Sequence, residues 1–134
     1  MTVEERRLVL FLRFNAILLL SALVPAVMPL AWMDAIHRWL GLGELPEGPI
    51  VSYLTRSLSA MYAMHGAIVY FVSLDVRRYL PVVKCLGCLA VAFGGGMLVL
   101  DAAIGMPTAW TVCEGPIVMA IGVIVLALAR RLPA

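Results

Sequence analysis

Residues 80–104 read LPVVKCLGCLAVAFGGGMLVLDAAI, and this run carries only two charged side chains, Lys84 and Asp101. About 20 mostly apolar residues are enough for a helix to cross a hydrocarbon layer roughly 30 Å thick. A strand of this composition would leave peptide groups unpaired in lipid, whereas a helix satisfies them internally. The run therefore predicts a transmembrane α-helix.

The composition of the whole chain agrees with this interpretation. Of its 134 residues, 63% are hydrophobic and only 13% are charged. The charged share is about half of that in a soluble globular domain. Such a composition excludes a disordered chain, a nucleic-acid-binding module and an ordinary soluble enzyme domain. We expect an integral membrane protein.

Three further apolar segments accompany the first. They cover residues of about 9–32, 50–74 and 109–129, so the sequence predicts four transmembrane helices. Two connections, Asp75–Tyr79 and Gly105–Thr108, are short, which makes consecutive helices antiparallel neighbours. We expect an all-α fold, a four-transmembrane-helix up-and-down bundle, as a single integral membrane domain over residues 1–134. The longer connection, 34–49, should begin with a short amphipathic surface helix that carries Trp39 and Leu40.

The charged residues predict the orientation of this bundle. With four crossings, one side of the membrane receives most of the basic residues: Arg6, Arg7, Arg77, Arg78, Lys84, Arg130 and Arg131. The other side receives Arg38 together with the acids Asp34, Glu44 and Glu47. The positive-inside rule then places the N- and C-termini in the cytoplasm.

Charged side chains inside the predicted spans mark candidate functional residues, because a charge in lipid is costly. Arg56, Asp101 and Glu114 lie on three different helices and, counted from the outer surface, at a similar depth in the outer leaflet. The helical period puts small residues on the faces of Arg56 and Asp101, and small residues let membrane helices approach closely. We therefore expect Arg56, Asp101 and Glu114 to form a ligand-binding cluster with Trp110 at its rim.

This cluster has two interpretations. One carboxylate paired with Arg56 could serve only to hold the bundle together. Because two acids would face one arginine, however, one acid should hold a proton, and a protonated carboxyl beside an ionised one can act as an acid–base pair. Whether the chain is an enzyme stays open, and no catalytic residue is assigned.

Three other residues are of types that can bind a metal or perform redox chemistry. His65 lies opposite Arg56 on its helix and one turn after Tyr62, which favours a Tyr–His hydrogen bond over a haem or metal ligand. Cys85 and Cys88 form a C-x-x-C spacing on the cytoplasmic side, where the reducing compartment favours packing over redox chemistry. We expect no metal site and no cofactor.

From Arg56 to Arg130 the order of short motifs resembles that of a known group. The run Arg56-Ser-Leu-Ser-Ala-Met-Tyr62 leads to Gly66, Asp75 and Arg77-Arg78, and then to the glycine-rich helix, Asp101, Gly105-Met-Pro107, Trp110 and Glu114-Gly-Pro116. This order resembles the small four-helix bacterial membrane proteins around the DoxX-like families, many of which have no known function. The resemblance covers a little over half of the chain and implies the four-helix fold and a bacterial inner-membrane location. It transfers no catalytic residue, and His65 and the cysteine pair are not features of that group.

Two functions fit these expectations. In the first, the bundle holds a membrane lipid or another apolar small molecule in a pocket open to the outer leaflet. There Arg56, Asp101 and Glu114 would bind its polar groups or perform acid–base chemistry on it. In the second, the chain is a non-catalytic accessory or assembly subunit of a larger membrane protein complex, or a homo-oligomer, with the face of Gly87 and Gly94 against its partner. No nucleic-acid partner is expected.

Overall fold

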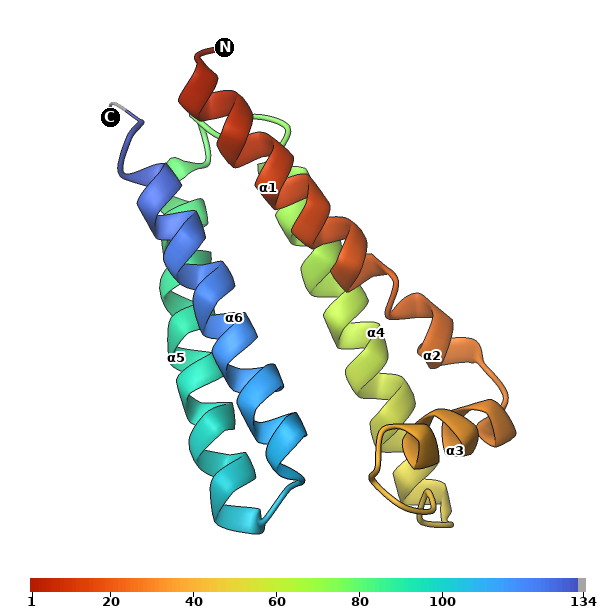
Figure 1. Cartoon of the computed structure of the whole chain (residues 1–134). Helices are drawn as coiled ribbons and strands as arrows, with labels where there is room; N and C mark the ends of the chain where they lie inside the picture. The colour runs from red at the N-terminus through yellow and green to blue at the C-terminus, as the bar shows by residue number, and fades with distance from the viewer. Residues whose placement is uncertain (133–134) are drawn as a thin grey trace. The chain divides into compact units, whose positions relative to one another are not determined.

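The computed structural model describes residues 1–132, and over that range the regular structure is entirely helical. Figure 1 shows the six α-helices along the chain: α1 (Val3–Leu20), α2 (Leu23–Val27), α3 (Leu30–Trp39), α4 (Pro49–Val72), α5 (Leu80–Ile104) and α6 (Thr108–Ala129). The all-α prediction is confirmed. The helices belong to two compact units, one joining Met1–Arg13 to the chain from Phe71 onward and the other comprising Phe14–Tyr70. A single domain over the whole chain stays a prediction.

Three segments of the described chain are long and apolar enough to cross a membrane. They are Val3–Val27, Leu80–Ile104 and Thr108–Ala129. Helix α4 is long enough, with 24 residues, but Arg56, His65 and several hydroxyl-bearing residues lower its mean hydropathy. Length and composition therefore support three of the four predicted spans, and the span at α4 stays a prediction.

The first predicted span, 9–32, is wrong as a single helix because two prolines interrupt it. Pro25 has no N–H to donate to the carbonyl of Ser21, and the N–H of Val24 bonds that carbonyl instead, at 3.0 Å. Pro29 then ends α2 and precedes α3. The amphipathic helix expected from Asp34 is present as α3, but it begins at Leu30.

Helix α5 has the bounds that the sequence predicts, 80–104, because its end is marked chemically. Gly105 follows it with a φ of 73°, in the left-handed region that glycine adopts without a steric penalty. The N–H of Met106 also reaches back to the carbonyl of Asp101 at 2.9 Å. Pro107 then precedes the first turn of α6, where a missing N–H costs nothing.

Helices α5 and α6 form an antiparallel hairpin, as Figure 1 shows, and glycines lie at the contact between them. The buried residues Gly87 and Gly94 on α5 and Gly115 and Gly122 on α6 are seven residues apart on each helix. A Cβ built on Gly94 would lie 2.6 Å from the carbonyl oxygen of Gly115, and one on Gly122 would lie 2.6 Å from that of Gly87. The two backbones therefore touch directly, as in small-residue packing between membrane helices.

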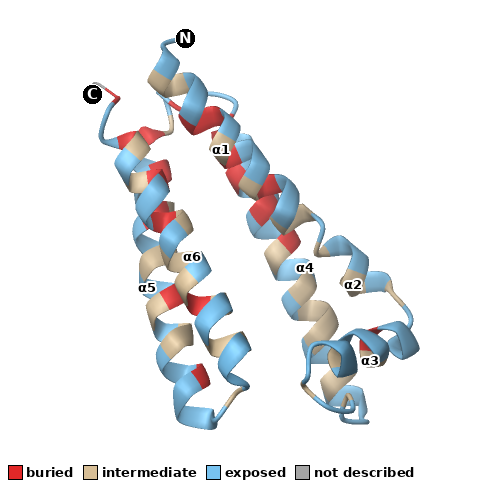
Figure 2. Ribbon diagram, viewed as in Figure 1, coloured by how far each residue is buried: buried red, intermediate tan, exposed pale blue. Residues whose placement is uncertain are grey.

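This packing corrects one expectation. The face of Gly87 and Gly94 was predicted to bind a partner protein, but α6 covers it. The outward sides of the hairpin are largely exposed (Figure 2). The exposed residues there include the apolar Phe93, Val99 and Val123. Apolar surface of this extent is typical of contact with lipid rather than water.

The ends of the first unit are joined by charge pairs. Thr2 and Glu5 form a capping box at the start of α1, with reciprocal bonds of 3.1 and 3.2 Å. The Glu5 carboxylate also accepts a hydrogen bond from Arg77 Nε at 3.2 Å, and Glu4 lies 3.5 Å from Arg131 Nη1. The start of α1, the turn after α4 and the end of α6 therefore lie together at one end of this unit, and the orientation of the chain in a membrane stays a prediction.

Candidate functional site

Asp101 is buried on the face of α5 that packs against α6. It follows Gly87 and Gly94 at the same seven-residue spacing, so it shares their face of the helix. Gly87 faces Gly122 and Gly94 faces Gly115, which fixes the antiparallel register of the two helices. Seven residues further along α5, and seven residues back along α6, the same register puts Asp101 level with Thr108. The side chain is 2% exposed, and its Oδ2 atom has no hydrogen-bond partner within residues 1–132.

Glu114 and Trp110 form a second polar group on α6. They are four residues apart, one helical turn, and Trp110 Nε1 donates a hydrogen bond to Glu114 Oε2. Both side chains are half-buried. The structure thus brings together two of the four residues that the sequence nominated.

The hairpin register separates Asp101 from Glu114 along the helix axis. Asp101 is level with Thr108, so Glu114 is six residues, or about 9 Å, further along α6. Helical side chains lean toward the N-terminus of their own helix, and in an antiparallel pair the two carboxyl groups therefore lean toward each other's level. Within the described chain no hydrogen bond joins them.

Arg56 lies in the other unit and binds backbone there. Its Nη1 donates to the carbonyl of Ala26 at 2.9 Å and its Nη2 to that of Met28 at 3.1 Å, while Nε lies 3.4 Å from the Ser52 hydroxyl. These carbonyls precede the break at Pro29, where the helical ladder ends and leaves its last acceptors without donors. The sequence pattern did not predict this role for Arg56, although Pro29 marks the break in the helix. The cluster of Arg56 with both acids stays a prediction.

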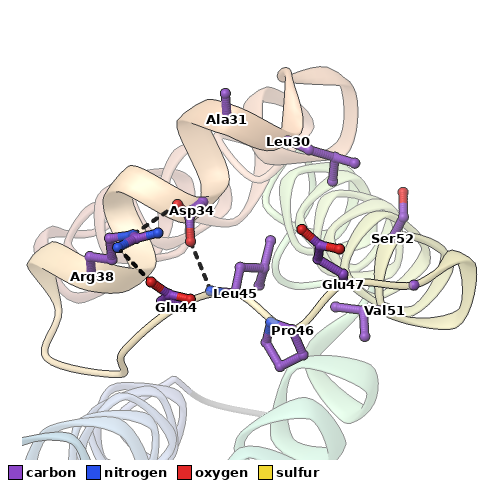
Figure 3. A pocket seen from close by; sticks show the side chains of 11 residues that line it. Leu30, Ala31, Asp34, Arg38, Glu44, Leu45, Pro46, Glu47, Val51 and Ser52 are labelled. Carbon is purple, nitrogen blue, oxygen red and sulfur yellow. Dashed lines mark hydrogen bonds and ion pairs between the residues drawn. The ribbon is translucent and has the colours of Figure 1, made fainter.

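A pocket of about 620 Å³, absent from the sequence predictions, lies between α3, the loop after it and the start of α4. Figure 3 shows Arg38 between two carboxylates: its Nε lies 2.9 Å from Asp34 and its Nη1 lies 3.1 Å from Glu44. The Leu45 N–H donates to Asp34 at 2.8 Å, which lowers the pKa of Asp34, and Arg38 lowers it further. The wall is completed by these residues: Leu30, Ala31, Pro46, Glu47, Gly48, Val51 and Ser52.

The other residues weighed in the sequence lie on outer surfaces. His65 is exposed on α4, and the thiols of Cys85, Cys88 and Cys113 are exposed and unbridged. Within residues 1–132, no three His, Cys, Asp or Glu side chains lie close enough together to hold a metal ion. The hydrogen bond expected between His65 and Tyr62 stays a prediction.

Similarity to proteins of known function would indicate the roles of these residues independently of the structure. The resemblance to the DoxX-like families rests on the short motifs between Arg56 and Arg130 alone. No protein-family model, curated protein or solved structure matches the chain.

Proposed function

We propose that the chain is a four-pass protein of a bacterial inner membrane, with both termini in the cytoplasm, that holds a lipid-like or apolar ligand through the buried carboxyl group of Asp101. The DoxX-like resemblance is part of this proposal, since it implies the same fold and location. The observation that carries the ligand is the buried Oδ2 atom of Asp101 on the α6-facing side of α5, which has no hydrogen-bond partner within residues 1–132.

Charge pairs support the four crossings. Glu5 at the start of α1 binds Arg77 in the turn after α4. A chain that leaves this end through α1 and returns to it at Arg77 crosses the membrane an even number of times. Because Val3–Val27 is apolar enough to cross once, we assign the return crossing to α4.

Helix α4 also satisfies most of its own polar groups. Thr55, Ser57 and Ser59 donate their hydroxyls to carbonyls of the preceding turn, at 2.9, 3.2 and 2.7 Å. Hydroxyls bonded in this way add little cost in lipid, where an unsatisfied group costs several kcal/mol. With 24 residues, α4 is about 36 Å long, enough to span the hydrocarbon layer.

Asp101 supports ligand binding because a buried oxygen without a donor is costly. The penalty for an unsatisfied buried polar group is about 1–3 kcal/mol, and more when the group is charged. A ligand that brings a hydroxyl or amine to Oδ2 would remove this penalty. Trp110 and Glu114, which lie two and six residues further along α6 than the level of Asp101, would bind further apolar and polar parts of it.

Arg56 lies in the other unit, where its described bonds use three of the five N–H groups of a guanidinium. Acid–base chemistry by Asp101 and Glu114 would require a ligand with an exchangeable proton, and the proposal is limited to binding.

The test is the mass retained by the protein after gentle extraction from its own membranes, measured by native mass spectrometry. We expect the natural protein to carry a small ligand and Asp101→Asn to lose at least about nine-tenths of it, because the amide replaces one acceptor oxygen with a donor. Asp75→Asn, the same change in the exposed turn, is the matched control. Full retention by Asp101→Asn with an unchanged melting temperature would refute the assignment.

The alternative, an accessory or assembly subunit, would show a retained protein mass in the same experiment. One observation favours it: Gly95 and Gly96 lie next to the hairpin contact, and a Cβ on either would meet nothing within 4 Å. Exposed glycines on an apolar helix leave room for another helix to approach. A partner or second copy would therefore use this face instead of that of Gly87 and Gly94.

A further inference from the structure

The loop that forms one wall of the pocket between α3 and α4 is held by its own turns and hydrogen bonds. Residues 41–48 fold back over α3 with Gly41, Gly43 and Gly48 at positive φ values of 77°, 81° and 141°. The Leu45 N–H bonds Asp34, and His37 Nδ1 lies 2.9 Å from the carbonyl oxygen of Gly43. A loop held by its own bonds and turns loses little conformational freedom on binding, which favours affinity.

The charges that line this pocket do not balance. Three carboxylates, those of Asp34, Glu44 and Glu47, face one guanidinium, that of Arg38. Arg38 pairs with Asp34 and Glu44, whereas none of the bonds or ion pairs described within residues 1–132 involves Glu47. An excess of two negative charges makes the pocket complementary to a cation and unfavourable to an anion.

Glu47 stands on the pocket side of the loop. Figure 3 shows its carboxylate between the side chains of Leu45 and Ser52, apart from the dashed network of Arg38. A carboxylate that lines a concave wall and has no protein partner can accept hydrogen bonds from an ammonium group. Such charge-assisted bonds are stronger than neutral ones.

The remaining wall and its surroundings are apolar. Leu30, Leu45 and Val51 line the pocket, and the neighbouring helix surface carries Trp32 and Trp39, which are 64% and 83% exposed. An amphipathic helix with exposed tryptophans is typical of a membrane–water interface. A ligand at this place would have an alkyl part beside its charged group.

We infer that this pocket binds the ammonium group of an amphiphilic amine, with Glu47 as the principal acceptor and the alkyl chain along Leu30 and Val51. The ammonium could belong to an amine-bearing lipid headgroup or to a free alkylamine. The site differs from that of the proposed function: it lies within Phe14–Tyr70, and its acceptor is not Asp101.

The experiment compares three chain-matched probes, octylammonium, octanol and octanoate, on the full chain at pH 7 in a neutral detergent. Bound fractions are read by native mass spectrometry. We expect octylammonium to bind at least about tenfold more tightly than octanoate, with octanol in between. Glu47→Gln should weaken octylammonium binding by about three- to tenfold and leave octanol unchanged.

The matched control is Glu4→Gln, which removes the same charge at a place outside the pocket and should leave all three affinities unchanged. Glu47 is exposed, so its substitution should keep the fold, which an unchanged melting temperature would verify. Equal affinity for octylammonium and octanol, or an unchanged affinity in Glu47→Gln, would overturn the inference.

The source of the amine follows from lipids extracted with the protein. Enrichment of amine-headgroup lipids over the bulk membrane in the natural protein, lost in Glu47→Gln, would identify the lipid. Octylammonium binding without such enrichment would support the same site with a free amine as its ligand. Because Asp101→Asn should leave octylammonium binding unchanged, failure at one site is distinguishable from failure at the other.

Discussion

Arg56 holds together a break in the chain thirty residues before it. Its guanidinium donates to the carbonyls of Ala26 and Met28, which the interruption at Pro29 leaves without helical donors. Carbonyls without donors are costly away from water, so a half-buried arginine that binds two of them can be retained for structure alone. These two carbonyls support a structural role for Arg56. A ligand role for its remaining N–H groups stays a prediction.

At this scale we predict that Arg56→Met lowers the free energy of unfolding by about 2 kcal/mol or more, because two carbonyls lose their donors. Arg56→Lys should recover only part of the loss, since a single ammonium does not match the fork of a guanidinium. Reversible unfolding in mixed detergent, followed by circular dichroism, measures both. Arg6→Met, at an exposed residue outside the described bonds, is the control. If the two methionine variants are equally stable, the carbonyls have other donors.

Helices α5 and α6 depend on the absence of side chains at four positions. Where the backbones approach at Gly94 and Gly115, a methyl group would lie 2.6 Å from a carbonyl oxygen, which a rigid helix cannot move aside. Gly95, the next residue, has open space around its Cβ position. Two adjacent glycines of one triplet therefore have opposite roles.

For this element we predict that Gly94→Ala lowers the free energy of unfolding by about 1–3 kcal/mol through overpacking. Gly95→Ala should leave it unchanged or raise it by up to about 1 kcal/mol, because alanine favours a helix. The same denaturation assay applies to both. Equal effects of the two substitutions would mean that the hairpin does not pack through Gly94.

At the scale of the whole molecule, two ion pairs join segments that are far apart in the sequence: Glu5 with Arg77 and Glu4 with Arg131. They gather the start of α1, the turn after α4 and the end of α6 at one end of the first unit, an arrangement that the proposed four crossings would produce. Hydropathy supports only three spans, because Arg56 and His65 lie in α4. The number of crossings is therefore the property to measure.

We predict that single cysteines at Arg6 and Arg130 react with a membrane-impermeant maleimide only after the cells are opened, whereas one at Pro46 reacts in intact cells. The three natural cysteines are exposed and are replaced by serine first. With three crossings, the cysteine at 130 would react from the same side as that at 46. That result would remove α4 from the membrane.

The sequence predicted best where a feature is local. The bounds of α5 followed from a long apolar run that ends at glycine and proline, and the α6 start differs by one residue from the prediction. It predicted worst at residues 9–32, where hydropathy continues through Pro25 and Pro29 although the helical hydrogen bonds do not. Among the site residues, the Trp110–Glu114 contact was within reach of sequence because the two lie one turn apart.

By itself the sequence determined the helical class, the apolar character of three spans and the small-residue stripe on α5, since composition and period depend only on neighbours along one helix. Only the tertiary structure decided what that stripe contacts, where Arg56 donates and that a pocket forms between α3 and α4. These features join residues far apart in the chain, such as Ala26 and Arg56. Their meeting depends on breaks, register and loop conformation, which hydropathy and helical period do not encode.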